Sequence, residues 1–309
     1  MKIGKRIALF VGVNILIIAT LSLLMSLLGV RPYLDAKGID YQSLMIFCLI
    51  WGFGGAFISL AMSRMMAKWM MGVKLVDPND SNREYRELVD KVHEYSRAAG
   101  LEVMPEVGVY DSPELNAFAT GPTRNRSLVA VSTGLLQRMN SKERDGVLAH
   151  EIAHIANGDM VTMTLAQGVV NAFVMFFARV AAFFASQFVA EEKRPMVQMG
   201  IVVVLELALG VLGMILISFF SRVREYRADD GGANLSSPGA MIAALEKLKA
   251  NYSLESEDNQ PALATLKISG KAQGLLSLFS THPRLEDRIA ALKEKHFVLS
   301  MKSNTYEII

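Results

Sequence analysis

Four long apolar runs constrain the fold of this chain more than any other feature of its sequence. They cover residues 7–30, 43–63, 160–187 and 196–220. About 20 consecutive apolar residues make a helix long enough to cross a bilayer, and a helix satisfies its own backbone hydrogen bonds in lipid. The pattern therefore predicts an integral membrane protein with four transmembrane helices.

Positive charges at the ends of the first two runs predict their orientation. The first run follows Lys2, Lys5 and Arg6. The second run is followed by Arg64 and Lys68. Because Lys and Arg gather on the cytoplasmic side of a membrane, both chain termini are expected in the cytoplasm. A cleaved signal peptide is the alternative for the first run, but this run is longer than the usual apolar core of about 7–15 residues and has no small-residue cleavage site.

Small and charged residues inside the runs predict contacts between helices. Four small residues of the second run share one helical face and favour close packing in lipid: Gly52, Ala56, Ser59 and Ser63. Glu206 lies deep in the fourth run, where an ionisable group indicates either a functional role or a packing pair with Arg179 of the third run. Both interpretations fit the sequence, so Glu206 is not assigned to a site.

The polar stretches between and after the spans predict a discontinuous α+β domain. The chain is expected to divide into two membrane segments, 1–75 and 160–220, and two segments of one cytoplasmic domain, 76–159 and 221–309. In the first domain segment, helical patterns cover Asn82 to Ala99 and the stretch from the Asn140-Ser141 cap to the Asn157-Gly158 stop. Three β-type runs lie between them: Glu106 to Tyr110, Leu115 to Thr120 and Ser127 to Ser132.

The second of these helices carries the motif His150-Glu151-x-x-His154. Positions four apart share one helical face, so the two histidines can hold one metal ion while Glu151 projects beside them toward a water on that ion. The alternative is a helix with two solvated or core histidines. Such a motif is expected by accident less than about once in a hundred chains of this composition, so a zinc hydrolase site is favoured.

A catalytic zinc usually has three protein ligands, so a third is needed. Glu225 is the candidate, because it lies just beyond the fourth run, whose cytoplasmic end is expected near the start of the third and hence near His154. Asp229, one turn further on the same face, and Asp159, five residues after His154, can hold a ligand histidine through a hydrogen bond. From the residues alone, Glu225 is equally well explained as one charge in a basic membrane flank.

Composition and missing motifs exclude other functions. A net charge of +2 without an aromatic-interleaved basic patch gives no case for nucleic-acid binding. The single cysteine, Cys48, lies in an apolar run, so a zinc site must use His and carboxylate ligands. The sequence contains no phosphate-binding loop of the G-x-x-x-x-G-K-[ST] type, so no ATP requirement is expected.

Several motifs in order resemble the M48 family of membrane zinc metallopeptidases. They are the His150 motif, Glu225-x-x-x-Asp229, Asn116 to Gly121, Thr281-His282-Pro283 and Arg288. The resemblance implies a zincin-like (gluzincin) domain with one Zn²⁺ per chain, held by His150, His154 and Glu225. It also implies that Glu151 is the general base and that His282 and Arg288 stabilise the transition state. Substrate contacts are implied along an edge strand: Asn116, Ala117, Phe118 and Ala119.

The same resemblance implies a protease of the bacterial inner membrane. Its expected substrates are misfolded or damaged membrane proteins, in envelope quality control and the heat-shock response, with other membrane quality-control proteases as further partners. Residues 254–260 are expected to form a mobile loop. Two alternatives are a related processing peptidase for lipidated substrates, and a membrane scaffold or chaperone with a structural zinc. A structural site usually has four protein ligands, and no fourth Cys or His lies beside these motifs.

Overall fold

The computed structural model describes residues 34–35, 38–258 and 278–306, together with the single positions 19, 23 and 27. The chain forms two compact units, which we call the helical unit and the α/β unit. The helical unit takes Met1–Met62 and Val161–Ile217, and the α/β unit takes Ser63–Met160 and Ser218–Ile309. Apart from the three single positions, the first predicted span, 7–30, lies outside the described residues.

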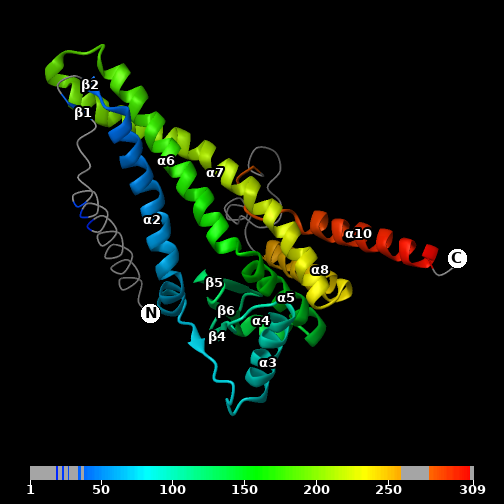
Figure 1. Cartoon of the computed structure of the whole chain (residues 1–309). Helices are drawn as coiled ribbons and strands as arrows, with labels where there is room; N and C mark the ends of the chain where they lie inside the picture. Colours follow the sequence, from blue (N-terminus) through cyan, green and yellow to red (C-terminus); the bar gives the residue numbers. More distant parts are fainter. Residues whose placement is uncertain are drawn as a thin grey trace. The chain divides into compact units, whose positions relative to one another are not determined.

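The helical unit consists mainly of long apolar helices (Figure 1). They belong to α2 (Tyr41–Met70), α6 (Asp159–Ser186) and α7 (Arg194–Leu235), and a short 3₁₀ helix, η1 (Glu191–Lys193), precedes α7. A small antiparallel pair of strands, β1 (Leu34–Asp35) and β2 (Gly38–Ile39), precedes α2. Within the described residues, three helical segments are long and apolar enough to cross a membrane: Tyr41–Met70, Asp159–Ser186 and Glu191–Leu235. These segments contain the second, third and fourth predicted spans, in that order.

Two predicted contacts inside the helical unit are present. A Cβ on Gly52 would lie 2.7 Å from the backbone nitrogen of Ala172, so this glycine allows α2 and α6 to approach closely. Arg179 of α6 forms an ion pair with Glu206 of α7, and its guanidinium lies 5.2 Å from the ring centroid of Phe47 on α2. The packing interpretation of Glu206 is therefore confirmed.

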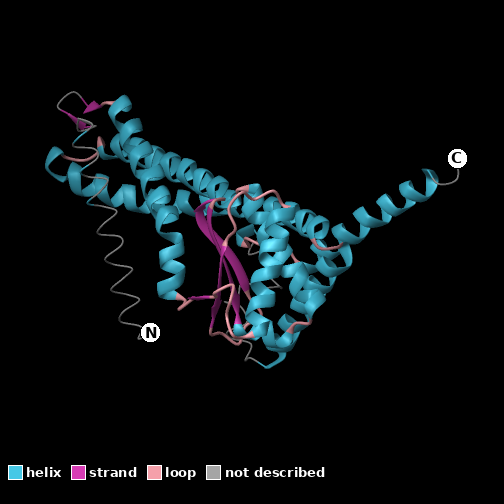
Figure 2. Cartoon of the chain, turned by 60° about the horizontal axis from the view of Figure 1, so that its bottom comes forward, coloured by secondary structure: helices cyan, strands magenta, loops and turns pink. Residues whose placement is uncertain are grey.

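A four-stranded sheet supplies the centre of the α/β unit. Its strands are β3 (Lys74–Leu75), β4 (Glu106–Tyr110), β5 (Ala117–Thr123) and β6 (Arg126–Ser132), in the order β3-β4-β6-β5. β4 and β6 are parallel, whereas β3 and β5 run antiparallel to their neighbours. β5 is therefore an edge strand of this sheet, as expected. Figure 2 draws these strands in magenta, as it does β1 and β2.

Among the described residues, five further helices complete the α/β unit together with the ends of α2 and α7. They are α3 (Arg83–Ala98), α4 (Thr133–Arg138), α5 (Ser141–Asn157), α8 (Pro238–Asp258) and α10 (Leu285–Tyr306). Alternate residues of β6 enter two apolar clusters, as a strand buried on both faces requires. Val129 and Val131 pack in one cluster with α3 and α5, and Leu128 and Ala130 pack in the other with Tyr110.

Two helices are longer than the sequence indicated. α7 continues past the predicted end of the fourth span, residue 220, to Leu235 without a break. Buried residues continue there at helical spacing, at Glu225, Ala228, Asp229 and Ala233, so packing supports the extra turns. α8 extends to Asp258, so the predicted loop at 254–260 is wrong over its first part.

Candidate metal centre

The centre begins with α5, whose ends are set by local sequence. The Asn140 side chain accepts a hydrogen bond from the backbone N–H of Glu143, and the Glu143 side chain accepts one from the backbone N–H of Asn140. Together these two bonds form a capping box. Gly158 ends the helix in the left-handed conformation, at φ 70°. These caps fix the helical register that places His150 and His154 on one face.

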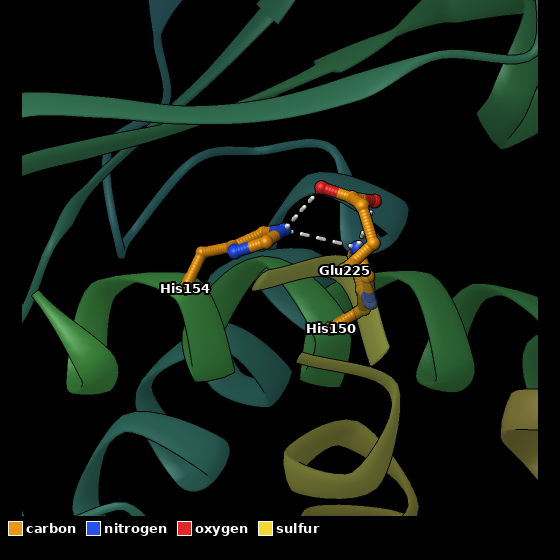
Figure 3. Close-up of side chains that lie close together, drawn as sticks. All are labelled: His150, His154 and Glu225. Atoms are coloured by element: carbon orange, nitrogen blue, oxygen red, sulfur yellow. Dashed lines mark hydrogen bonds and ion pairs between the residues drawn. The ribbon is translucent and has the colours of Figure 1, made fainter. Parts of the chain in front are cut away.

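Glu225 reaches the two histidines from α7. A Cβ on Gly232 would lie 3.1 Å from the backbone nitrogen of His150, so this glycine allows α7 to run close to α5. Glu225 is 1% exposed, and Figure 3 shows its carboxylate converging with the two imidazoles, two side chains from α5 and one from α7. The third predicted ligand thus lies beside the first two.

The distances between the candidate ligand atoms fit a zinc ion. Nε2 of His150 and Nε2 of His154 lie 3.1 Å apart. Oε1 of Glu225 lies 3.4 Å from Nε2 of His154, and Oε2 lies 3.6 Å from Nε2 of His150. Tetrahedral zinc with bonds of about 2.0–2.1 Å separates its ligand atoms by about 3.3–3.4 Å. The Glu225 carboxylate is buried against these imidazoles, which further fits a metal ligand.

Two aspartates lie beside the candidate ligand histidines. Nδ1 of His154 lies 2.6 Å from Oδ2 of Asp159, and Nδ1 of His150 lies 3.1 Å from Oδ1 of Asp229. Both carboxylates are buried. A carboxylate lies against Nδ1 of each histidine, as a hydrogen bond at His154 and at ion-pair distance at His150, and leaves Nε2 directed at the shared point, which is the arrangement that orients metal ligands.

The buried carboxylates also favour positive charge at this point. Burial alone would lower the pKa of His150, but Asp229 and Glu225 outweigh burial and raise this pKa to about 9. Burial likewise opposes a raised pKa at His154, where Asp159 and Glu225 outweigh it. A metal ion that binds here therefore displaces protons from the histidines.

His282 and Arg288 both lie next to Glu225, but in different surroundings. His282 is 63% exposed at its side chain, and its Nδ1 lies 2.9 Å from Oε2 of Glu225. The segment before it is held by Arg222, which donates to the carbonyls of Leu278 and Ser280 at 3.2 and 2.7 Å. Arg288 is buried and bonded to Asp229.

A cavity of about 610 Å³ opens beside the centre. Glu151 lines it together with His150 and Glu225, and Asn116 and Ala117 line it at the start of β5. An apolar wall comes from α8, a segment in which the sequence showed no functional signal: Met241, Leu245 and Leu248.

Two predicted substrate-contact residues do not line this cavity. The ring of Phe118 packs on Tyr110 with centroids 5.7 Å apart, and Ala119 packs against the cluster shared by β6 and α5. Successive strand residues point to opposite faces of a sheet, so Phe118 points away from Ala117. Phe118 and Ala119 belong to the edge strand through their backbone, and their predicted contacts with substrate stay a prediction.

Known proteins are similar to this chain over most of its length. Residues 82–296 match Peptidase family M48. A protein described as "Protease HtpX homolog" from Bacillus velezensis is 50% identical over 298 residues, covering 94% of this chain and 100% of the relative. A Bacillus subtilis protein of the same description is 51% identical over 299 residues, with the same coverage.

A solved structure extends the likeness to the fold. The structure titled "Crystal Structure of S. mikatae Ste24p" matches with a TM-score of 0.63 and 19% identity. The match covers 94% of this chain and 64% of that chain. At this identity the likeness concerns the fold alone.

Proposed function

This chain belongs to peptidase family M48, and from that membership we propose that it is a membrane-bound zinc endopeptidase whose α/β unit performs the hydrolysis. The observation that carries the proposal is the convergence of His150, His154 and Glu225, whose ligand atoms all lie within 4.8 Å of one another. Zinc held there would polarise the scissile carbonyl and increase the acidity of the attacking water.

The chain's own residues have separate tasks in this proposal. Glu151 lines the cavity next to His150, where its carboxylate can take a proton from water and pass it to the leaving amine. The exposed imidazole of His282 stands at the cavity, where it can donate to the carbonyl oxygen as negative charge develops. Asp159 and Asp229 keep the ligand imidazoles oriented.

An extended polypeptide is the substrate that the edge strand supports. Among the strands that the structure describes, β5 pairs with β6 alone, and Asn116 and Ala117 at its start line the cavity. A substrate segment can add to this edge through main-chain hydrogen bonds, which require an unfolded segment but little side-chain specificity. We therefore propose that misfolded membrane proteins are the substrates and that the enzyme acts in envelope quality control.

A scaffold with a structural zinc is less well supported than an enzyme. Among the described residues, the metal-ligand group comprises His150, His154 and Glu225 only, and it lies at a cavity. Structural zinc sites usually close all four positions with protein ligands, whereas catalytic sites leave one position open.

Cleavage of an unfolded membrane protein by the detergent-purified chain tests the proposed function. We expect cleavage in the presence of zinc, loss of cleavage after a chelator, and recovery when zinc is restored. A folded form of the same substrate serves as the control and should be cut slowly, because it offers no extended segment. Cleavage that persists without metal would contradict the proposal.

The apolar wall of the cavity predicts a preference for large apolar side chains beside the scissile bond. Leu248 is half-buried and lines the cavity, so Leu248→Phe reduces the space there. For peptides with an aromatic residue beside the scissile bond, we expect this variant to lower kcat/KM about tenfold relative to peptides with alanine at the same position. A peptide-library profile measures the change. Val103→Phe, at an exposed position away from the cavity, is the control, and identical profiles in both variants would refute the assignment.

We further propose that both termini and the α/β unit face the cytoplasm of a bacterial inner membrane. The basic residues around the first two apolar runs support this orientation. A reporter that is active only outside the cytoplasm should be active when inserted in η1, Glu191–Lys193, and silent when fused after Tyr306. A cytoplasmic signal from the η1 fusion would exclude the four-span topology.

A further inference from the structure

Arg288 is a buried arginine whose nitrogens all face carboxylates. It lies in the first turn of α10 and is 6% exposed. Its Nε and Nη2 donate to Oδ2 and Oδ1 of Asp229 at 2.7 and 2.6 Å, which makes the pair bidentate. Its Nη1 lies 3.4 Å from Oε2 of Glu225.

Arg288 lines the cavity, but this arrangement limits how its guanidinium can contact a substrate. The family resemblance implied that Arg288 stabilises the transition state directly. Two of its nitrogens already donate hydrogen bonds to Asp229. A buried bidentate arginine–carboxylate pair is strong and has a specific geometry. Direct donation to a substrate through Nε or Nη2 would require that pair to break.

Asp229 also lies against the candidate metal ligand His150. The same Oδ1 that accepts from Arg288 lies 3.1 Å from Nδ1 of His150. We infer that Arg288 is a positioning residue, which holds the Asp229 carboxylate, and through it the His150 imidazole, in the orientation that zinc binding requires. The inference rests on the proposed zinc function and assigns Arg288 to metal binding rather than to substrate.

The surroundings explain why an arginine is suited to this task. Glu225 and Asp229 are both 1% exposed and lie one turn apart on α7, so they need a nearby permanent positive charge. The planar guanidinium fixes both oxygens of Asp229 at once, whereas a lysine ammonium would act as a single point charge.

The helix that carries Arg288 is itself fixed in place. Ile289 and Leu292 of α10 pack in one apolar cluster with Met241 and Leu245 of α8. Lys295 of α10 also forms an ion pair with Asp230 of α7, at 2.6 Å. The guanidinium is therefore presented to Asp229 by a helix that has its own contacts with α7 and α8.

Zinc affinity, measured by competition with a fluorescent chelator on the full-length protein in detergent, tests the inference. We expect Arg288→Gln and Asp229→Asn each to weaken zinc binding about 10–100-fold, the range for a residue that orients a metal ligand. Arg288→Lys keeps the charge and should also weaken zinc binding, because it cannot hold both oxygens. The double variant should bind zinc no more weakly than the single variant with the lower zinc affinity. The loss of kcat at saturating zinc should be smaller than the loss of zinc affinity.

Lys293→Gln is the matched control, because Lys293 lies on the same helix and forms an exposed ion pair with Glu246. It should bind zinc like the wild type. The inference is overturned if Arg288→Gln or the more conservative Arg288→Lys binds zinc normally while kcat stays low at saturating zinc, since that pattern indicates direct contact with substrate. Additive losses in the double variant would also overturn it. A wild-type protein that binds no zinc would instead refute the proposed function, and this inference with it.

Discussion

The Glu151→Gln variant is expected to bind zinc like the wild type and to lose about two to four orders of magnitude in kcat. Glutamine keeps the shape of the side chain but cannot accept a proton from water. Glu151 lines the cavity beside His150 and is not in the ligand group of His150, His154 and Glu225, so metal binding should persist. The measurement is single-turnover cleavage of an unfolded substrate, together with the zinc content of the same sample.

Glu143→Gln is a suitable control for this experiment, because Glu143 is a carboxylate of the same helix whose role is to cap it. That variant should lose some stability and keep its turnover in the folded fraction. If Glu151→Gln cleaves as fast as the wild type, Glu151 is not the base and the proposed mechanism is wrong.

Replacing Glu225 with Gln is expected to remove zinc binding more completely than any change in the supporting residues. Gln keeps the volume but removes the anionic ligand, so the loss of affinity should exceed the roughly 10–100-fold range for residues that orient a ligand. Because Glu225 is 1% exposed and lies between Arg224 and Arg288, the variant also leaves buried positive charge less well balanced. Equilibrium dialysis against buffered zinc measures the affinity, and thermal unfolding checks the fold.

Glu246→Gln provides the comparison for a carboxylate outside the centre, since Glu246 forms an exposed ion pair on α8. It should bind zinc normally. Normal zinc affinity in Glu225→Gln would show that a different residue completes the centre, and the assignment of Glu225 would fail.

Local signals in the sequence predicted much of the α/β unit. The cap at Asn140 and the stop at Gly158 appear where expected, as does the strand Glu106–Tyr110, because caps, turns and alternation act over a few residues. The edge position of β5 was also anticipated, but only through family resemblance. The full length of α7 was missed, because its last turns are supported by burial at Glu225, Ala228 and Asp229 rather than by a continuous apolar pattern.

Long-range contacts account for what the sequence did not reveal about the site. Arg288 and Asp229 are 59 residues apart in sequence, and no local pattern distinguishes this pair from solvated charges. The apolar cavity wall on α8 likewise looks like the buried face of any helix. The two histidines were predicted from the four-residue spacing of their motif, which maps directly onto helical geometry, whereas Glu225 was assigned as the third ligand only through the family resemblance.

The most direct test of the account is a titration of metal-free protein with zinc while cleavage of an unfolded polypeptide is followed. The account predicts that activity rises with added zinc and reaches a plateau at about one zinc per chain, and that Glu151→Gln binds the same amount of zinc without gaining activity. Full activity in the metal-free protein, or tight binding of one zinc in the wild type that produces no cleavage of any unfolded substrate, would contradict a catalytic zinc at His150, His154 and Glu225.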